Sequence, residues 1–80
     1  MTQEQANNVE VTKKREEAAR LRSLAAGQKE YAAAHMRQAQ HPIYAGQEEV
    51  CAGKASQLEA FAEQNLAIAA RLDLEVQLLQ

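Results

Sequence analysis

Apolar residues in the second half of the chain recur in alternating steps of four and three, which is the spacing of a coiled-coil seam. The repeat consists of Tyr44, Glu48, Cys51, Ala55, Leu58, Ala62, Asn65, Ala69, Leu72, Val76 and Leu79. It predicts one long helix over about residues 45–80, with Glu48 and Asn65 as polar interruptions. A buried Asn65 would fix register and oligomeric state, whereas an Asn65 at the edge of the stripe would be partly exposed. The pattern leaves both interpretations open.

The first half carries a weaker stripe of smaller residues, which predicts a second helix over about residues 8–40 after a frayed segment at about residues 1–7. The stripe consists of Ala18, Leu21, Ala25, Ala32, His35 and Ala39, flanked by Leu24, Tyr31 and Met36. Two pairs fit a capping box at the start of this helix, Thr2 with Gln5 and Asn7 with Glu10. Because alanine is small, the stripe predicts a close approach between helices.

Residues 41–44 are the strongest break between the two patterns, because Pro42 can open a helix but is costly inside one. A short connection favours antiparallel packing of the segments that it joins. The predicted fold class is therefore all-α. We expect an antiparallel, coiled-coil-like two-helix hairpin, a single domain over residues 1–80, completed by self-association or by a partner protein.

Folding the chain at this break gives an expected register between the helices. Leu24 would meet Phe61, Leu21 would lie opposite Ala62, and Tyr31 would lie across Gly53. Gly27 would face the other helix in the same way. Both glycines cost helix stability, so close packing is one reason for their presence and simple tolerance is the other.

The two predicted helices carry opposite net charge. The half before Pro42 has seven basic and five acidic residues, and the half after it has two basic and six acidic residues. This asymmetry favours an antiparallel hairpin or an antiparallel dimer over parallel pairing. The run Lys13–Arg15 is predicted to be a solvated helix face, because Glu10 with Lys14 and Glu16 with Arg20 have the spacing of helical ion pairs.

The C-terminal stretch has more large aliphatic side chains than one neighbouring helix can cover, and these lie on more than one face. Such a surface predicts a partner, either a second copy in a bundle or a helical protein with a hydrophobic groove. The residues predicted to bind this partner are Leu58, Phe61, Asn65, Leu66, Ile68, Leu72, Leu74, Val76 and Leu79.

Length and composition narrow the class of protein. A chain of 80 residues has room for one small core, which is marginally stable without association. Cys51 is the single cysteine, and a lone thiol without a signal-peptide pattern predicts a cytoplasmic protein. A net charge of −2 and 4% aromatic residues argue against nucleic acid as a partner, including RNA bound by a helix-pair dimer. No apolar run approaches the ~20 residues of a membrane span, so no membrane partner is expected.

Catalytic motifs are not evident. The sequence has no glycine-rich phosphate loop, serine elbow or metalloprotease helix motif. His35, His41 and Cys51 fall near the turn but do not have the paired spacing of zinc ligands. We therefore expect a protein that is not an enzyme, with no metal and no cofactor.

Several short segments resemble a known family. Arg15-Glu16-Glu17-Ala18, the turn with Pro42 and Tyr44, and Leu58-Glu59-Ala60-Phe61 followed by Ile68 are similar to the small helical-hairpin co-chaperones of the type III secretion needle. The resemblance implies a cytoplasmic bacterial protein that pairs with a larger helical-repeat chaperone and helps to hold the needle subunit unpolymerised. It also implies that the apolar stripe is the chaperone-docking face.

A different class also fits the pattern. The chain could be a small homo-oligomer of phage or plasmid origin that inhibits a host protein or sequesters a small ligand. Polar and aromatic groups would then gather at the turn, where a nucleotide-like anion could bind between protomers. The residues of this alternative site are His35, Arg37, His41 and Tyr44, for which ordinary solvation of a turn is the simpler interpretation.

Overall fold

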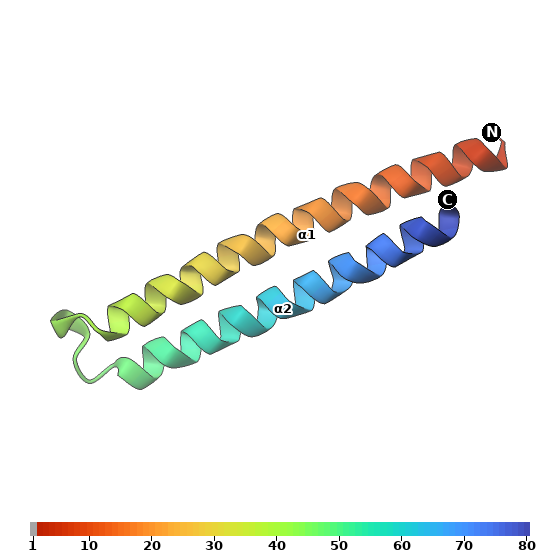
Figure 1. Cartoon of the computed structure of the whole chain (residues 1–80). Helices are drawn as coiled ribbons and strands as arrows, with labels where there is room; N and C mark the ends of the chain where they lie inside the picture. Colours follow the sequence, from red (N-terminus) through yellow and green to blue (C-terminus); the bar gives the residue numbers. More distant parts are fainter. Residues whose placement is uncertain (1) are drawn as a thin grey trace.

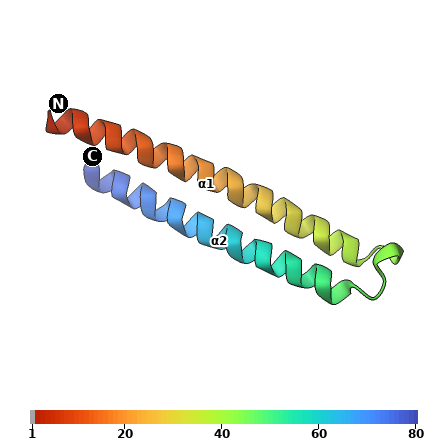
Figure 2. The ribbon, with the colours of Figure 1, turned by 180° about the vertical axis from the view of Figure 1, so that it is seen from behind.

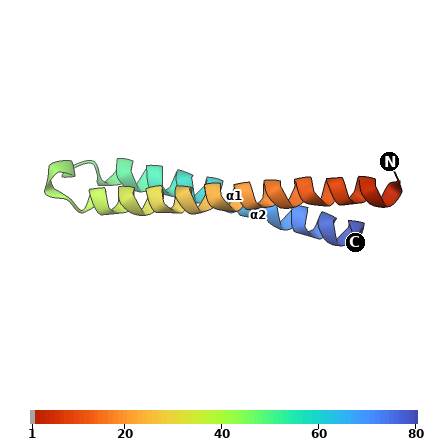
Figure 3. The ribbon, with the colours of Figure 1, turned by 90° about the horizontal axis from the view of Figure 1, so that it is seen from above.

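Two long antiparallel helices dominate the computed structural model, which describes residues 2–80 (Figure 1). Helix α1 spans Gln3–Ala39, the 3-10 helix η1 spans Pro42–Tyr44, and helix α2 spans Glu48–Leu79. The helices lie side by side along their length, and the start of α1 extends beyond the end of α2 (Figures 1 and 2). They cross at a shallow angle in the view from above (Figure 3). The hairpin measures 63 × 14 × 13 Å between Cα atoms, and the predicted all-α antiparallel hairpin is confirmed.

The first helix begins with the earlier of the two capping boxes. The Thr2 hydroxyl accepts a hydrogen bond from the Gln5 backbone N–H at 3.1 Å, and the Gln5 side chain accepts one from the Thr2 N–H at 2.9 Å. These bonds satisfy two backbone donors that a helix start otherwise leaves free. The predicted start near Asn8 was therefore too late, and residues 3–7 are helical rather than frayed.

The turn is longer than the sequence suggested. Pro42 opens the short helix η1 and not α2, and the chain continues through Gly46 before α2 begins at Glu48. Gly46 has φ +90°, a conformation that costs any residue with a Cβ about 1–2 kcal/mol. Its N–H donates to the Glu48 carboxylate at 3.1 Å, which ties the turn to the first residue of α2.

Alanine forms most of the seam between the helices. The buried residues of α2 follow the predicted repeat, and the buried residues of α1 follow the predicted stripe with one addition near its start. They are Val11, Ala18, Leu21, Ala25 and Ala32 on α1, and Cys51, Ala55, Ala62, Ala69 and Val76 on α2. A buried alanine methyl contributes about 0.8 kcal/mol, against about 1.5–3 kcal/mol for a fully buried leucine. The hairpin therefore has a regular seam and little hydrophobic stabilisation of its own.

Ion pairs across the seam fix the register. Lys14 reaches Glu75 at 3.0 Å, Lys29 reaches Glu63 at 3.2 Å, and Arg22 pairs with Asp73, always with the cation on α1 and the carboxylate on α2. This arrangement agrees with the charge asymmetry of the sequence. Within α1, Lys14 also pairs with Glu10 as expected, but Arg20 bonds Glu17 and not Glu16.

The predicted register was wrong by more than one helical turn. Leu21 shares a buried cluster with Ala18 and Ala69, and Leu72 packs against it; the expected neighbour was Ala62. The cause is the turn, because α2 begins at Glu48 and each residue of α1 consequently faces a later residue of α2.

The two helical glycines are not close-packing positions in the hairpin. A Cβ added at Gly27 or at Gly53 would have no atom within 4 Å, apart from atoms of the glycine's chain neighbours and its own helix backbone. The expectations that Tyr31 lies across Gly53 and that Gly27 faces the other helix are both wrong.

Candidate partner-binding surface

Large apolar side chains gather on one side of the alanine seam. Leu24 and Tyr31 come directly before the buried residues Ala25 and Ala32 of α1, and Phe61 and Ile68 come directly before Ala62 and Ala69 of α2. Successive residues of an α-helix are about 100° apart, and the two helices run in opposite directions, so residues that precede seam positions lie on the same side in both helices. We call this set of four, Leu24, Tyr31, Phe61 and Ile68, the apolar flank.

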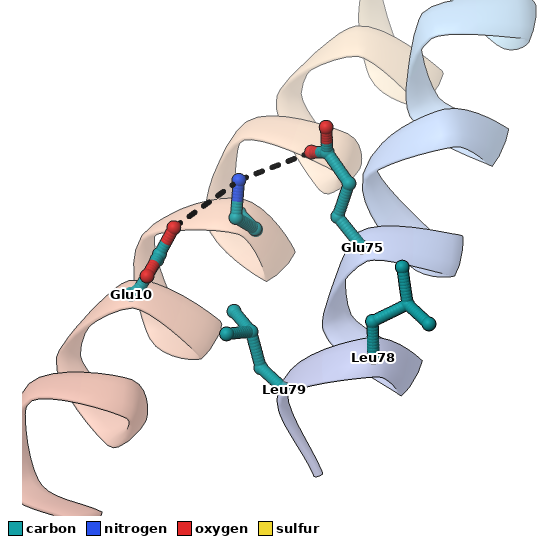
Figure 4. A pocket seen from close by; sticks show the side chains of 5 residues that line it. Glu10, Glu75, Leu78 and Leu79 are labelled. Atoms are coloured by element: carbon teal, nitrogen blue, oxygen red, sulfur yellow. Dashed lines mark hydrogen bonds and ion pairs between the residues drawn. The ribbon is translucent and has the colours of Figure 1, made fainter. Parts of the chain in front are cut away.

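Charged residues at the open end of the hairpin, the end opposite the turn, support this assignment. Glu10 precedes Val11 and Glu75 precedes Val76, so the same rule places both carboxylates on one side. Lys14 bonds both of them, at 3.6 Å and 3.0 Å (Figure 4). The opposite side of the seam is held by Arg22 with Asp73, as expected for residues that follow the seam positions Leu21 and Leu72.

The apolar flank is open to solvent. Leu24, Phe61 and Ile68 are 43–44% exposed, and Tyr31 is 67% exposed. The Tyr31 ring lines a shallow hollow on the outside of α1 with Gly27 and Ala34. Exposed single apolar residues are common, but here the side chains are larger than almost everything in the seam that the hairpin buries.

The predicted partner-binding residues do not form a single surface. Five of them, Leu58, Asn65, Leu72, Val76 and Leu79, are seam residues that are buried or half-buried against α1. Val76 is only 6% exposed, so a partner cannot reach it while the hairpin is closed. Phe61, Ile68 and Leu74 point outward, and Leu66 is half-buried. Leu74 is 60% exposed but lies away from the apolar flank, on the outer face of α2.

The sequence pattern missed the contribution of α1 to this surface. The expected register placed Leu24 opposite Phe61 and Tyr31 across Gly53, and it did not place either of them on one outward side together with Phe61 and Ile68. The missing signal was their position directly before a seam alanine, which places them on the same side as the α2 residues once the helices are antiparallel.

One polar pair interrupts the seam. The Asn65 side-chain amide donates to the Gln28 side-chain oxygen at 3.0 Å, and both residues are partly buried. Asn65 therefore lies at the seam with a partner inside the hairpin. The pair adds a polar contact between α1 and α2 among the alanines.

The open end holds a small charged cluster. Glu10, Lys14 and Glu75 line a hollow of about 250 Å³ together with Leu78 and Leu79 (Figure 4). The pKa of Lys14 is raised mainly by its hydrogen bond to Glu75. Partial burial acts in the opposite direction, and the negative charges of Glu75 and Glu10 raise the pKa further. The cluster contains two carboxylates and one ammonium group, so its formal charge is negative.

The residues of the alternative turn site are only partly together. Arg37, His41 and Tyr44 line one hollow of about 420 Å³ at the turn, and His35 is not among its lining residues. His35 lies half-buried with its Nδ1 atom 3.2 Å from Gln38 Oε1. The His41 Nδ1 atom accepts a hydrogen bond from the Ile43 N–H, and its ring meets Tyr44 edge to face. The turn therefore uses His41 to hold its own backbone.

No group of three or more histidine, cysteine or acidic residues within residues 2–80 has the spacing to hold a metal ion. Cys51 is buried in the seam, away from solvent. Neither helix of the described chain is long and apolar enough to cross a membrane. Comparisons of the chain with protein-family models, with curated proteins and with solved structures gave no match.

Proposed function

We propose that this chain is a non-enzymatic interaction module of the cytoplasm, whose hairpin binds another helical protein surface through the apolar flank. The observation that carries the proposal is that the hairpin buries small side chains and exposes large apolar ones. The seam between the helices is built mainly of alanine, while Leu24, Tyr31, Phe61 and Ile68 face solvent. In this proposal the chain has no catalytic role and needs no cofactor.

The free energy gained by covering the apolar flank favours association. Full burial of a large apolar side chain is worth about 1.5–3 kcal/mol, and these four are roughly half exposed, so covering them would contribute on the order of 3–6 kcal/mol before the costs of binding. That contribution is comparable to the whole stability of a small single-core domain, about 3–5 kcal/mol. Covering the flank would thus stabilise the hairpin as well as the complex.

The co-chaperone resemblance remains a prediction within this proposal. The hairpin shape is compatible with it, and the larger chaperone would then cover the apolar flank. The alternative role as a small inhibitor with a ligand site at the turn has less support, because His41 is engaged with the turn backbone and His35 lies outside the hollow.

Site-specific photo-crosslinking in cells that make the chain at its natural level tests the proposal. A benzophenone amino acid at Tyr31 or at Phe61 should give a discrete adduct on irradiation, whether with another protein or with a second copy. The same probe at Leu74, which is exposed on the outer face of α2, is the matched control and should give none. Equal adducts at all three positions, or none at Tyr31 and Phe61, would overturn the proposal.

A further inference from the structure

We infer that the partner on the apolar flank is a second copy of this chain, docked antiparallel so that the two turns lie at opposite ends of a four-helix bundle. This inference rests on the proposed function and adds the identity and direction of the partner. In this dimer α1 lies against α1 of the second copy, and α2 lies against its α2.

The apolar flank is complementary to itself in this direction. A two-fold axis placed midway between Leu24 and Tyr31 brings Leu24 of one copy against Tyr31 of the other. The same axis brings Phe61 against Ile68 of the other copy, because both pairs have the same seven-residue spacing and the bond between Gln28 and Asn65 puts their midpoints level. Every large side chain of the flank therefore meets another large side chain.

Charge selects the antiparallel direction. Glu17 and Glu75 lie on the same flank toward the open end, and Lys54 lies on it toward the turn, each one heptad beyond an apolar residue. The antiparallel dimer puts Lys54 against Glu75 of the second copy, and symmetry repeats the contact. A parallel dimer would instead put Glu17 against Glu75 of the second copy, and two like-charge contacts would oppose it.

The charged groups at the two ends of the apolar flank are not balanced within one hairpin. The cluster of Glu10, Lys14 and Glu75 has one carboxylate more than it has ammonium groups. Lys54 takes part in no ion pair within residues 2–80. Lys54 of the second copy thus supplies the cation that the cluster does not have.

Gly27 lies level with this axis on α1. Packing inside the hairpin does not require a glycine there, since an added Cβ would meet nothing within 4 Å. Gly27 lies between Leu24 and Tyr31 in sequence and beside Tyr31 in the hollow on α1. In the dimer the two copies of Gly27 lie level with the two-fold axis, at the outer edge of the contact between the two α1 helices.

The contact area is sufficient for a stable dimer. With 1.5 Å per residue, the two hairpins overlap over about 50 Å around the axis. Across a hairpin 14 Å wide, this overlap gives on the order of 600–700 Å² per copy, which lies near the ~800 Å² per partner of standard stable interfaces.

Sedimentation equilibrium tests whether the partner is a second copy of the chain. The wild-type chain should have twice the 8.8 kDa mass of one copy. Phe61→Glu should weaken the dimer at least about 100-fold while the circular dichroism stays helical, and Leu74→Glu, the matched control on the outer face, should leave the mass unchanged. A wild-type monomer at millimolar concentration, or a dimer that only Leu74→Glu disrupts, would overturn the inference.

These outcomes are separable from those of the proposed function. A monomer that still gives crosslinks from Tyr31 and Phe61 to a different protein means that the flank binds a partner and that the second copy is the wrong one. A monomer without such crosslinks means that both proposals fail.

Disulfide trapping tests the direction. In a Cys51→Ala background, a chain with Lys54→Cys is mixed with a chain with Glu75→Cys. These positions are about 30 Å apart along α2, and a disulfide needs Cα atoms within about 7 Å, so a parallel dimer cannot link them. The expected product is the mixed disulfide, with each variant alone as the control. A dimer that forms no mixed disulfide would refute the antiparallel arrangement.

Discussion

Replacing Gly53 with alanine should stabilise the hairpin by about 0.5–1 kcal/mol. Gly53 lies inside α2, where glycine loses more backbone freedom on folding than alanine does. The structure has room for the new methyl group, because no atom of the folded chain outside its own helix backbone and adjacent residues lies within 4 Å of it. For a domain of this size each kcal/mol raises Tm by about 4–8 °C, so the expected rise is about 2–8 °C.

Thermal unfolding followed by circular dichroism measures this change, at one fixed chain concentration because association would shift Tm. Gly46→Ala is the control of opposite sign, since Gly46 has φ +90° and should lose about 1–2 kcal/mol. A lower Tm for Gly53→Ala would refute the reasoning. That result would mean that a side chain occupies this space, as in the register where Tyr31 crosses Gly53.

Three further changes test separate features of the chain. Thr2→Ala should remove the capping box, cost about 0.5–1 kcal/mol, and speed amide exchange in the first turn of α1 while leaving α2 unchanged. Asn65→Leu should raise the free energy of unfolding by about 1 kcal/mol in urea, because a half-buried seam position becomes apolar; a loss of 1 kcal/mol or more would show that the bond to Gln28 matters more. Glu48 accepts hydrogen bonds from its own N–H and from the Gly46 N–H, which lower its pKa. The stabilisation by Glu48 is therefore present above its unfolded pKa and is lost as pH falls through its folded pKa. Glu48→Gln should reduce the loss of unfolding free energy on acidification, measured by urea unfolding at several pH values. An unchanged dependence on pH would contradict this role.

The seam was predictable because it depends on spacing alone. The predicted seam positions of α2 from Cys51 to Leu79 are all buried or half-buried, and the stripe of α1 from Ala18 to Ala39 follows it. Helix periodicity and alanine size determine these contacts without knowledge of the turn. The charge asymmetry also predicted the sense of the ion pairs between the helices.

The turn could not be predicted from Pro42 alone. Proline marks where a helix cannot continue, but the number of residues before the next helix depends on the left-handed conformation of Gly46 and on its bond to Glu48. An error of a few residues in the turn shifts every facing pair along the hairpin. The expected neighbour of Leu21 and the expected role of Gly53 failed for this reason.

The partner-binding surface was only partly predictable for the same reason. The sequence identified Phe61 and Ile68 as apolar and outside the seam repeat, but it grouped them with seam residues such as Val76. Leu24 and Tyr31 join them only through the pairing of two helices. A surface that two segments share depends on their direction and register, which a pattern along one segment does not contain.

Small-angle X-ray scattering of the purified wild-type chain tests the central claim most directly, because it reports mass and length together. The antiparallel dimer should have twice the 8.8 kDa mass and a longest dimension of about 75 Å between Cα atoms, since both open ends of the hairpins project beyond the overlap. A particle with the mass of one copy and a length near 63 Å would contradict the second copy as partner. A particle with twice that mass and the same 63 Å length would contradict the antiparallel direction.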